Sequence, residues 1–278
     1  RWKELDFSFS IEGLARFRGN CFVQQGYTGL AIRTLPLRIM NFVELGLPAP
    51  IMTSLCEKPK GLVLITGATG SGKTTTLAAM VNHINHTTPC HIITVEDPIE
   101  YIHTSQKAIL DQREVGPDTR SFAQALKYIL RQDPDVILVG EMRDLETIET
   151  ALVVAETGHL VLATLHTSDA VQTANRIVDV FPAHQQNQVK VQLSMELLAI
   201  ISQQLVPKAS GKGRALATEV LIANHAVRSL IRESKVHQLY SVIQTGQKEG
   251  MRTMNQALYE LYVNRAITGD EAMARSSD

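Results

Sequence analysis

The chain opens with short segments in which apolar and polar residues alternate. Three such segments, residues 7–11, 15–18 and 29–33, are separated by Gly13, Gly19 and Gly26. Alternation with a period of two is typical of strands that bury one face, and glycines between such runs are typical of turns. We therefore predict antiparallel strands joined by turns.

Three prolines, Pro36, Pro48 and Pro50, then interrupt regular structure around Leu45-Gly46-Leu47. Because proline and glycine break both helices and strands, this stretch suits a linker between two structural units. We place a domain boundary there.

From Lys60 the pattern changes to short, β-branched-rich apolar runs separated by segments with helical periodicity. Apolar residues recur at helical spacing between the runs: Leu77, Met80, Val81 and Ile84, then Phe122, Ala125, Leu126 and Ile129, then Leu145, Ile148, Leu152 and Ala155. The runs that we predict as strands are residues 61–66, 91–95, 136–139 and 160–165. Continuous apolar strands alternating with helices indicate an α/β fold, with a mostly parallel sheet covered by helices on its faces.

After Asp169 the sequence becomes mainly helical. One predicted helical stripe consists of Val189, Leu193, Leu197, Ile200 and Ile201. Residues 209–213, Ala-Ser-Gly-Lys-Gly, predict a hairpin loop between strands at 204–206 and 218–221. Two or three helices are expected to follow, one of them over residues 254–263.

Composition narrows the class of protein. The 278 residues are 44% hydrophobic and 20% charged, which excludes a disordered or fibrous chain. Lys and Arg number 27 against 28 Asp and Glu, a net charge of -1, so bulk electrostatics give no reason to expect a nucleic acid partner. No apolar run approaches the roughly 20 residues of a membrane span. We expect a soluble protein that is not exported.

Cysteine usage fits a reducing cytosol. Cys21, Cys56 and Cys90 are odd in number and widely spaced, so they form neither a disulfide framework nor a CxxC zinc site. Since the sequence starts at Arg1 in the middle of a pattern, we also expect part of the first domain to precede it.

The strongest chemical signal is Gly-Ala-Thr-Gly-Ser-Gly-Lys-Thr at residues 67–74. It matches the phosphate-loop pattern G-x-x-x-x-G-K-[ST] and lies between a predicted buried strand and an amphipathic helix, as that mechanism requires. Backbone N–H groups and the helix N-terminus would face one anion, Lys73 would offset phosphate charge, and Thr74 would place its hydroxyl on Mg²⁺. The predicted ATP-binding residues are Gly67, Ala68, Thr69, Gly70, Ser71, Gly72, Lys73, Thr74 and Thr75.

Polar residues follow three of the predicted strands. Ligands gather at the carboxyl ends of parallel strands, where this sequence has Glu96, Glu141 and His166. We predict that Glu96 activates the attacking water and that Glu141 helps to hold Mg²⁺, directly or through water. His166 could hydrogen-bond the γ-phosphate. His159 follows Gly158, a predicted helix C-cap, and is either a weaker site candidate or a partner of that helix's carbonyls.

Two arginines share one face of a predicted strand. In Ala15-Arg16-Phe17-Arg18, alternation places Arg16 and Arg18 on the face opposite Ala15 and Phe17. The charge spacing alone favours a solvated surface, and the alternative is that these residues, with Arg33, reach a neighbouring subunit's nucleotide as arginine fingers.

Together these motifs resemble the PilT-type retraction ATPases of type IV pili, within the wider secretion ATPase group. The resemblance is carried by the phosphate loop, the acidic box at residues 93–100, the second acidic strand at 135–144, the His box at 157–167, and residues 226–233, which are similar to a C-terminal motif of retraction members. It covers nearly the whole chain. It implies a RecA-like P-loop NTPase core with a truncated PAS-like α+β N-terminal domain and a helical C-terminal segment. The implied division is a PAS-like remnant at 1–36, a linker at 37–50, the core at 51–221 and the helical segment at 222–278.

The resemblance also implies function and partners. It implies a cytoplasmic homohexamer at the inner-membrane base of the pilus, using ATP and Mg²⁺ to power retraction, with a membrane platform protein and a related assembly or retraction ATPase as partners. By position, Glu96 becomes the catalytic glutamate and Glu141 the acidic-strand carboxylate. His159 and His166 become His-box residues, and Arg16, Arg18 and Arg33 become N-terminal-domain arginines that meet the phosphates.

Three residues depart from the family's pattern, and four alternatives to a principal retraction motor remain at this point. Ala68 stands where many members have proline, and Val227 and Ser229 replace an expected Ile and Asn, which leaves open an accessory paralogue. A pilus assembly or type II secretion ATPase commonly carries a four-cysteine zinc motif, and this sequence has no CxxC. A non-hydrolytic nucleotide-binding scaffold is disfavoured by Glu96, Glu141 and His166, and a DNA-dependent RecA-type motor by the near-neutral charge.

Overall fold

The computed structural model describes residues 4–12, 14–35 and 38–276. Gly13 and Pro36, which the sequence analysis used to mark a turn and a linker, lie outside the described residues. Among the described residues there is no helix with both the length and the apolar character that a membrane crossing requires.

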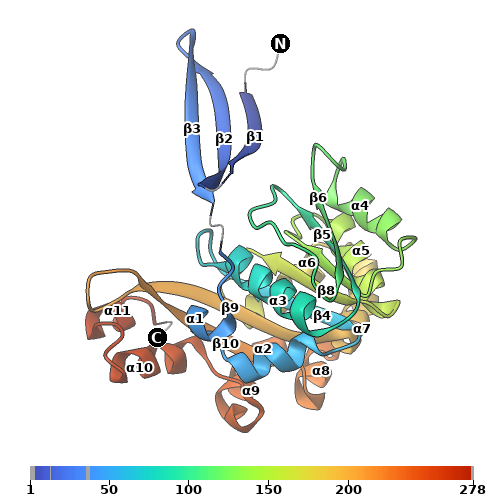
Figure 1. The fold of residues 1–278 in the computed structure, drawn as a ribbon. Coiled ribbons are helices and arrows are strands. Elements are labelled where there is room, and N and C mark those ends of the chain that lie inside the picture. The colour runs from blue at the N-terminus through green and yellow to red at the C-terminus, as the bar shows by residue number, and fades with distance from the viewer. Residues whose placement is uncertain (1–3, 13, 36–37, 277–278) are drawn as a thin grey trace.

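The N-terminal part is a three-stranded antiparallel sheet that projects from the rest of the chain (Figure 1). Its strands, in the order β1-β2-β3, are β1 (Glu4–Ile11), β2 (Ala15–Gln24) and β3 (Tyr27–Leu35). Gln25 and Gly26 have φ of 49° and 85°, the positive values of a two-residue hairpin turn. The predicted antiparallel strands and the turn at Gly26 are confirmed.

The predicted break at Gly19 is wrong, because β2 continues through it. Gly19 pairs with Phe7 of β1, and a Cβ at Gly19 would lie 2.4 Å from the tip of the Phe7 ring. The glycine thus lets an aromatic ring pack across the neighbouring strand instead of turning the chain.

The two faces of this sheet differ in chemistry. Phe9 stacks on Phe17 with 5.1 Å between ring centroids, and both lie on the apolar face. The register pairs Arg18 with Arg33, and alternation puts Arg16 on their face, as predicted for Arg16 and Arg18.

The second part is a seven-stranded sheet of order β10-β9-β4-β8-β7-β5-β6 (Figure 1). All neighbouring pairs are parallel except β9 and β10. The strands are β4 (Gly61–Thr66), β5 (His91–Glu96), β6 (Ile109–Glu114), β7 (Val136–Val139), β8 (Leu160–Leu165), β9 (Leu197–Pro207) and β10 (Arg214–Ile222). The mostly parallel sheet and the hairpin across residues 209–213 are confirmed. Strand β6 was not predicted.

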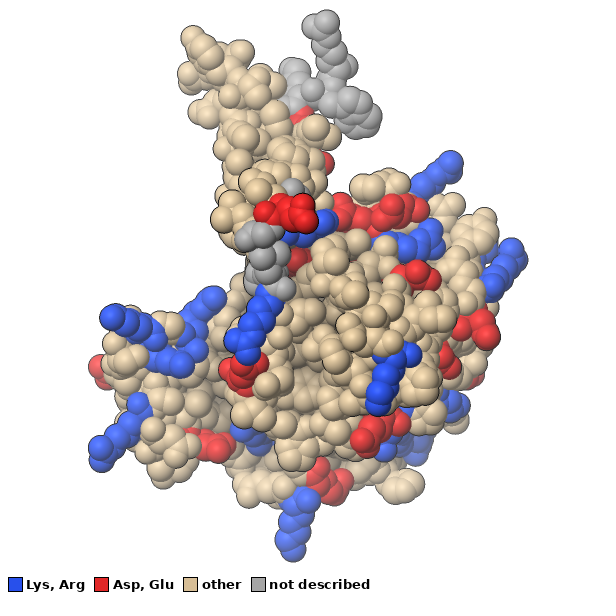
Figure 2. Space-filling view, in the orientation of Figure 1, with Lys and Arg blue, Asp and Glu red and all other residues tan. Residues whose placement is uncertain are grey.

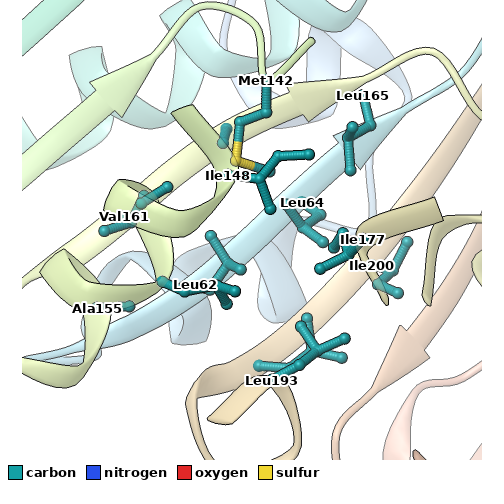
Figure 3. Packing of buried hydrophobic residues seen from close by; sticks show 14 of the residues in the cluster. Leu62, Leu64, Met142, Ile148, Ala155, Val161, Leu165, Ile177, Leu193 and Ile200 are labelled. Carbon is teal, nitrogen blue, oxygen red and sulfur yellow. The ribbon is translucent and has the colours of Figure 1, made fainter. Parts of the chain in front are cut away.

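Helices cover both faces of this sheet. Alternate strand residues divide between two apolar clusters: Leu62 and Leu64 face one, Val63 and Ile65 the other. The second cluster includes side chains of α1 (Phe42–Leu45), α2 (Ala49–Cys56) and α3 (Lys73–Thr87). The first includes side chains of α4 (Phe122–Ile129), α5 (Leu145–Glu156), α6 (Ala170–Asp179), α7 (Ala183–Glu196), α8 (His225–Arg232) and α9 (Leu239–Thr245), and Figure 3 shows part of its packing.

Two further segments differ from the sequence-based expectation. The predicted helical stripe fails at Leu197, because α7 ends at Glu196 and Leu197, Ile200 and Ile201 belong to β9. A fully buried apolar run has no polar face to reveal its period, so helix and strand look alike there. Within the predicted linker, α1 forms a helical turn, with a capping box between Asn41 and Glu44.

The C-terminal part is helical, as predicted. After the 3₁₀ turns at Val236–Gln238 and Gln247–Glu249, α10 (Met254–Val263) and α11 (Gly269–Met273) follow, and α10 packs on the β9–β10 hairpin. In the motif at 226–233, Arg228 donates from Nη1 to the carbonyl of Ser194 at 2.6 Å and also to that of Met195, so it caps the last turn of α7.

Candidate active site

The loop after β4 has a backbone that requires glycine. Strand β4 is buried along its whole length, and Gly67, Gly70 and Gly72 that follow it have φ of 139°, 81° and 95°. A Cβ at Gly67 would lie 2.4 Å from the carbonyl oxygen of Gln203 on β9. The chain therefore curls tightly here before α3 begins at Lys73, which leaves the first N–H groups of the helix at the loop.

Two polar side chains of this loop, Lys73 and Ser71, are placed where they can bind an anion. Lys73 donates from Nζ to the carbonyls of Gly67 at 2.7 Å and Ala68 at 3.1 Å. Burial lowers the pKa of Lys73, and the charge of Glu141 opposes that shift. Among the described residues, the buried Ser71 Oγ has no hydrogen-bond partner. The Lys73 ammonium, which donates to carbonyls of its own loop, and the unpaired Ser71 hydroxyl are therefore suited to bind a phosphate group.

Glu96 ends β5 with a carboxylate that is buried and held by two donors. Thr94 Oγ1 donates to Glu96 Oε1 at 2.7 Å, and Gln112 Nε2 donates to the same oxygen at 3.2 Å. Burial raises the pKa of Glu96 above its ordinary value, and these two hydrogen bonds oppose the shift without cancelling it. A carboxylate with a raised pKa is suited to accept a proton near neutral pH.

Glu141 follows β7, and its carboxylate contacts Arg143 two residues later and His166 at the end of β8. Its Oε1 lies 2.5 Å from Arg143 Nε and 3.0 Å from His166 Nε2. Burial alone would raise the pKa of Glu141, but the hydrogen bond from Arg143 and the charge of His166 outweigh it, so the pKa lies below its ordinary value. Glu141 is therefore ionised at neutral pH, as a carboxylate that binds a metal ion must be.

Pairing of the strands brings these residues together. Thr66 of β4 pairs with Leu165 of β8, and Val139 of β7 pairs with Val95 of β5. The phosphate loop, His166, Glu141 and Glu96 therefore follow one another along the carboxyl edge of the sheet, in the order β4, β8, β7, β5. They surround a cleft of about 440 Å³, whose lining includes Thr69, Gly70, Gly72, Lys73, Thr74, Thr75, Glu96, Glu141 and His166.

The N-terminal sheet contributes to the same cleft. Arg18 and Arg33, which pair across β2 and β3, both line it. The structure thus places two of the three predicted arginines beside the phosphate loop of their own chain. The third, Arg16, instead donates from Nη2 to Ser8 Oγ at 2.9 Å and lies 3.8 Å from Glu114 Oε2 at the end of β6.

His159 is not brought to the cleft. It precedes β8 at the amino end of the strand, whereas His166 follows the carboxyl end. Its Nδ1 lies 3.0 Å from the carbonyl oxygen of Val154 in the last turn of α5. Of the two sequence-based alternatives for His159, its position agrees with the one in which it contacts the carbonyls of the preceding helix.

Sequence reasoning missed several polar residues of the cleft. Arg143 stands two residues after Glu141, and this proximity could have indicated it. Arg214 starts β10, while Tyr101 and His103 lie in the loop after β5, and all three line the cleft. No local pattern marks these residues, because only the folding of the loop and the hairpin brings them there.

The chain is similar to known proteins over most of its length. The family described as "Type II/IV secretion system protein" matches residues 26–212, more than half of the sequence. The chain belongs to this family. It is 53% identical over 272 residues to a "Twitching motility protein" of Neisseria gonorrhoeae, covering 98% of this chain and 72% of that protein. It is 50% identical over 273 residues to the "Type IV pilus retractation ATPase PilT" of Pseudomonas aeruginosa, covering 98% and 79%.

Solved structures of the family have the same fold. The crystal structure titled "Pilus Retraction Motor PilT and Bound ADP" matches with a TM-score of 0.93 at 55% identity, over 99% of this chain and 78% of that one. The Legionella pneumophila ATPase DotB matches with a TM-score of 0.85 at 29% identity, over 98% and 77%. The predicted PilT-type family and secretion ATPase fold are confirmed.

Proposed function

We propose that this protein is an ATP-hydrolysing motor that powers retraction of type IV pili. The observation that carries the proposal is one cleft lined by a phosphate loop, a buried glutamate, an ionised glutamate, a histidine and two arginines of the N-terminal sheet. High identity over 98% of the chain to a protein described as a pilus retraction ATPase supports the same function.

The phosphate loop binds the triphosphate. The N–H groups of the loop and of the start of α3 face the phosphate oxygens, and Lys73 Nζ leaves the carbonyls of Gly67 and Ala68 to neutralise them. The Thr74 hydroxyl and the Glu141 carboxylate, directly or through water, are the residues that would hold Mg²⁺. When bound, that ion neutralises charge on the β- and γ-phosphates. Both line the cleft beside Lys73, so the residues present fit the ion.

Glu96 orients the attacking water and accepts its proton. Its burial keeps the pKa above the ordinary carboxyl range, which matches a general base more closely to neutral pH. His166, beside Glu141 at the end of β8, donates to the γ-phosphate and so senses whether it is present.

Movement follows from the loss of the γ-phosphate. Arg18 and Arg33 reach the cleft from the N-terminal sheet, whereas the phosphate loop belongs to the core. A γ-phosphate bridges these two parts through charge-assisted hydrogen bonds, and hydrolysis removes them. The N-terminal domain, proposed at residues 1–36, then rotates as a rigid body about a linker at 37–50 against the core at 51–221 and the helical segment at 222–278.

We extend the proposal to the assembly. Six copies form a cytoplasmic ring at the inner-membrane base of the pilus and turn a platform protein, in cooperation with a related assembly or retraction ATPase. A second candidate is an accessory retraction ATPase. It is favoured by 46% identity over 98% of the chain to the P. aeruginosa "Type IV pilus ATPase PilU" and by Val227 and Ser229 in the C-terminal motif.

Piliation of cells tests the function. The source bacterium carries Glu96→Gln in place of the native residue, and pili are counted by electron microscopy while twitching is followed on a surface. Retraction predicts immobile cells with more pili than the parent. An accessory role predicts normal numbers of pili with weakened twitching, and bald cells would contradict both by indicating assembly. Ser105→Ala, an exposed substitution outside the cleft, is the matched control.

A further inference from the structure

We propose that Gln112 is a positioning residue that holds the carboxylate of Glu96 in place to accept a proton from the attacking water and that links it to the phosphate-loop helix. This inference rests on the proposed role of Glu96 as the general base. It concerns a residue of the edge strand β6, one strand away from Glu96 and outside the motifs that identify the cleft.

The side-chain amide of Gln112 makes three hydrogen bonds. Its Nε2 donates to Glu96 Oε1 at 3.2 Å and to the carbonyl of Tyr101 at 2.9 Å, and its Oε1 accepts from the backbone N–H of His103 at 2.8 Å. The amide therefore ties the glutamate to the loop that follows it.

Orientation of the glutamate depends on two donors to one oxygen. Thr94 Oγ1 reaches Glu96 Oε1 from the same strand, two residues away, and Gln112 reaches it from β6. Donors from two directions restrict rotation of the carboxylate about its last side-chain bond. A base held within a few tenths of an ångström of the reactive geometry is much more effective than one that rotates.

The loop carries the connection to the phosphate site. Tyr101, whose carbonyl Gln112 binds, places its hydroxyl 3.0 Å from Thr75 Oγ1. Thr75 lies on α3 immediately after Thr74 and lines the cleft. Hydrogen bonds through Gln112 and Tyr101 thus link the base to the helix that begins with Lys73 and Thr74.

Only an amide of this length satisfies all three partners. Two of them are acceptors and one is a donor, and glutamine supplies two N–H donors and one acceptor. Glutamate would offer no donor to Glu96, asparagine is one methylene shorter, and leucine fills the volume without any hydrogen bond.

The surrounding charges stay constant in the test. Two further carboxyl groups lie near Glu96. Glu100 lies in the loop that follows it, and Glu114 of β6 pairs with Glu96 in the sheet register. The other ionisable groups that line the cleft are Arg18, Arg33, Lys73, Asp97, Tyr101, His103, Glu141, Arg143, His166 and Arg214. Removing the Gln112 donor changes none of these groups, so a change in the titration of the base reports the lost hydrogen bond.

The experiment measures the single-turnover rate of ATP cleavage by the full chain as a function of pH, with binding of fluorescent ADP measured in parallel. For Gln112→Leu we expect a rate about tenfold lower at neutral pH, since a hydrogen bond to a charged group is lost. Affinity for ADP should stay within about twofold of the parent. The acid limb of the rate profile should move to higher pH, because a hydrogen bond that lowers the pKa of the base is gone.

Two further variants keep the result decisive. Gln112→Asn keeps an uncharged amide that is one methylene too short to reach Glu96, and we expect it to lower the rate and move the acid limb in the same direction even where Gln112→Leu folds poorly. Ser105→Ala removes only the bond from Leu110 N to Ser105 Oγ, at 3.1 Å, which joins the same loop to β6 away from Glu96. It should leave rate and acid limb unchanged.

An acid limb that stays in place in both Gln112 variants would overturn the inference, whatever the rate. Glu96→Gln in the same assay separates this failure from that of the proposed function. If Glu96→Gln stops cleavage while the Gln112 variants behave like the parent, Gln112 alone is wrongly assigned. If Glu96→Gln cleaves ATP at the parental rate, the assigned base is wrong and the positioning role falls with it.

Discussion

Alanine at Gly67 should destabilise the protein far more than alanine at Gly70, although both glycines have positive φ. Gly67 has φ of 139°, and an added Cβ would lie 2.4 Å from Gln203 O and 2.6 Å from Ser71 Oγ. The Gly70 Cβ, at φ of 81°, would meet nothing within 4 Å. The two substitutions therefore share backbone strain, and only the first adds steric overlap with a neighbouring strand.

The magnitudes follow from these two contributions. Positive φ in a residue with a Cβ costs about 1–2 kcal/mol, which is the whole expected effect at Gly70. At Gly67 the overlap with the backbone of β9 forces a shift worth about 1–3 kcal/mol more. We expect Gly67→Ala to lower the free energy of unfolding by about 3 kcal/mol and Gly70→Ala by about 1 kcal/mol.

Urea unfolding without nucleotide, followed by circular dichroism, measures both values. With a slope of roughly 3 kcal/mol per molar urea, the midpoints should fall by about 1 M and about 0.3 M respectively. Equal shifts for the two variants would refute the reasoning, because they would mean that the loop at Gly67 has room for a side chain.

Three further outcomes are expected. Lys73→Ala should abolish productive nucleotide binding, checked by titration with fluorescent ADP, and an unchanged affinity would remove Lys73 from the phosphate site. Glu96→Gln should make the protein more stable to urea at pH 7.5: the pKa of Glu96 is higher in the folded than in the unfolded chain, so the native carboxylate contributes stability only when protonated and loses it as pH rises. The gain should shrink as the pH falls through the raised pKa of native Glu96 toward the ordinary carboxyl pKa and be absent below that value, and a gain that grows on acidification would contradict the assigned burial. Arg18→Ala should slow steady-state hydrolysis in the assembled ring about tenfold or more with little change in the subunit's ADP affinity, whereas Arg16→Ala should slow it less, because Arg16 contacts Ser8 and Glu114 outside the cleft. Equal rates for the two arginine variants would remove that distinction.

Much of the cleft could be predicted because its residues stand at fixed places in a parallel sheet. The buried strand, the glycines and Lys73 occur in sequence order, and Glu96, Glu141 and His166 each end a continuous apolar run. A strand that is buried on both faces carries a strong compositional signal, and its carboxyl end then locates the ligand edge.

The remainder depended on contacts between distant segments. Strand β6 is half exposed at the edge of the sheet and carries Gln112 among charged residues, so its sequence does not read as a core strand. The mistaken helix at Leu197 comes from a buried run without a polar face, and the mistaken break at Gly19 from an aromatic ring supplied by another strand. The different positions of Arg16 and Arg18 could not be separated by alternation, since both lie on one face.

Figure 2 shows acidic and basic side chains interspersed over the face in view, and both signs meet where the N-terminal sheet approaches the core. The ion pair of Arg16 and Glu114 lies between these two parts, with about a sixth of each side chain exposed. A nucleotide-dependent movement between the two parts would therefore change the distances between charged side chains at this junction, while the overall charge would stay the same.

Release of inorganic phosphate from ATP by the purified, ring-forming protein with magnesium tests the central claim most directly. The parent should release phosphate steadily, and Glu96→Gln should do so at least about a hundredfold more slowly while still binding ADP like the parent. Absence of phosphate release from the parent would contradict the motor and leave a nucleotide-binding scaffold. Release by Glu96→Gln at the parental rate would contradict the chemistry assigned to the cleft.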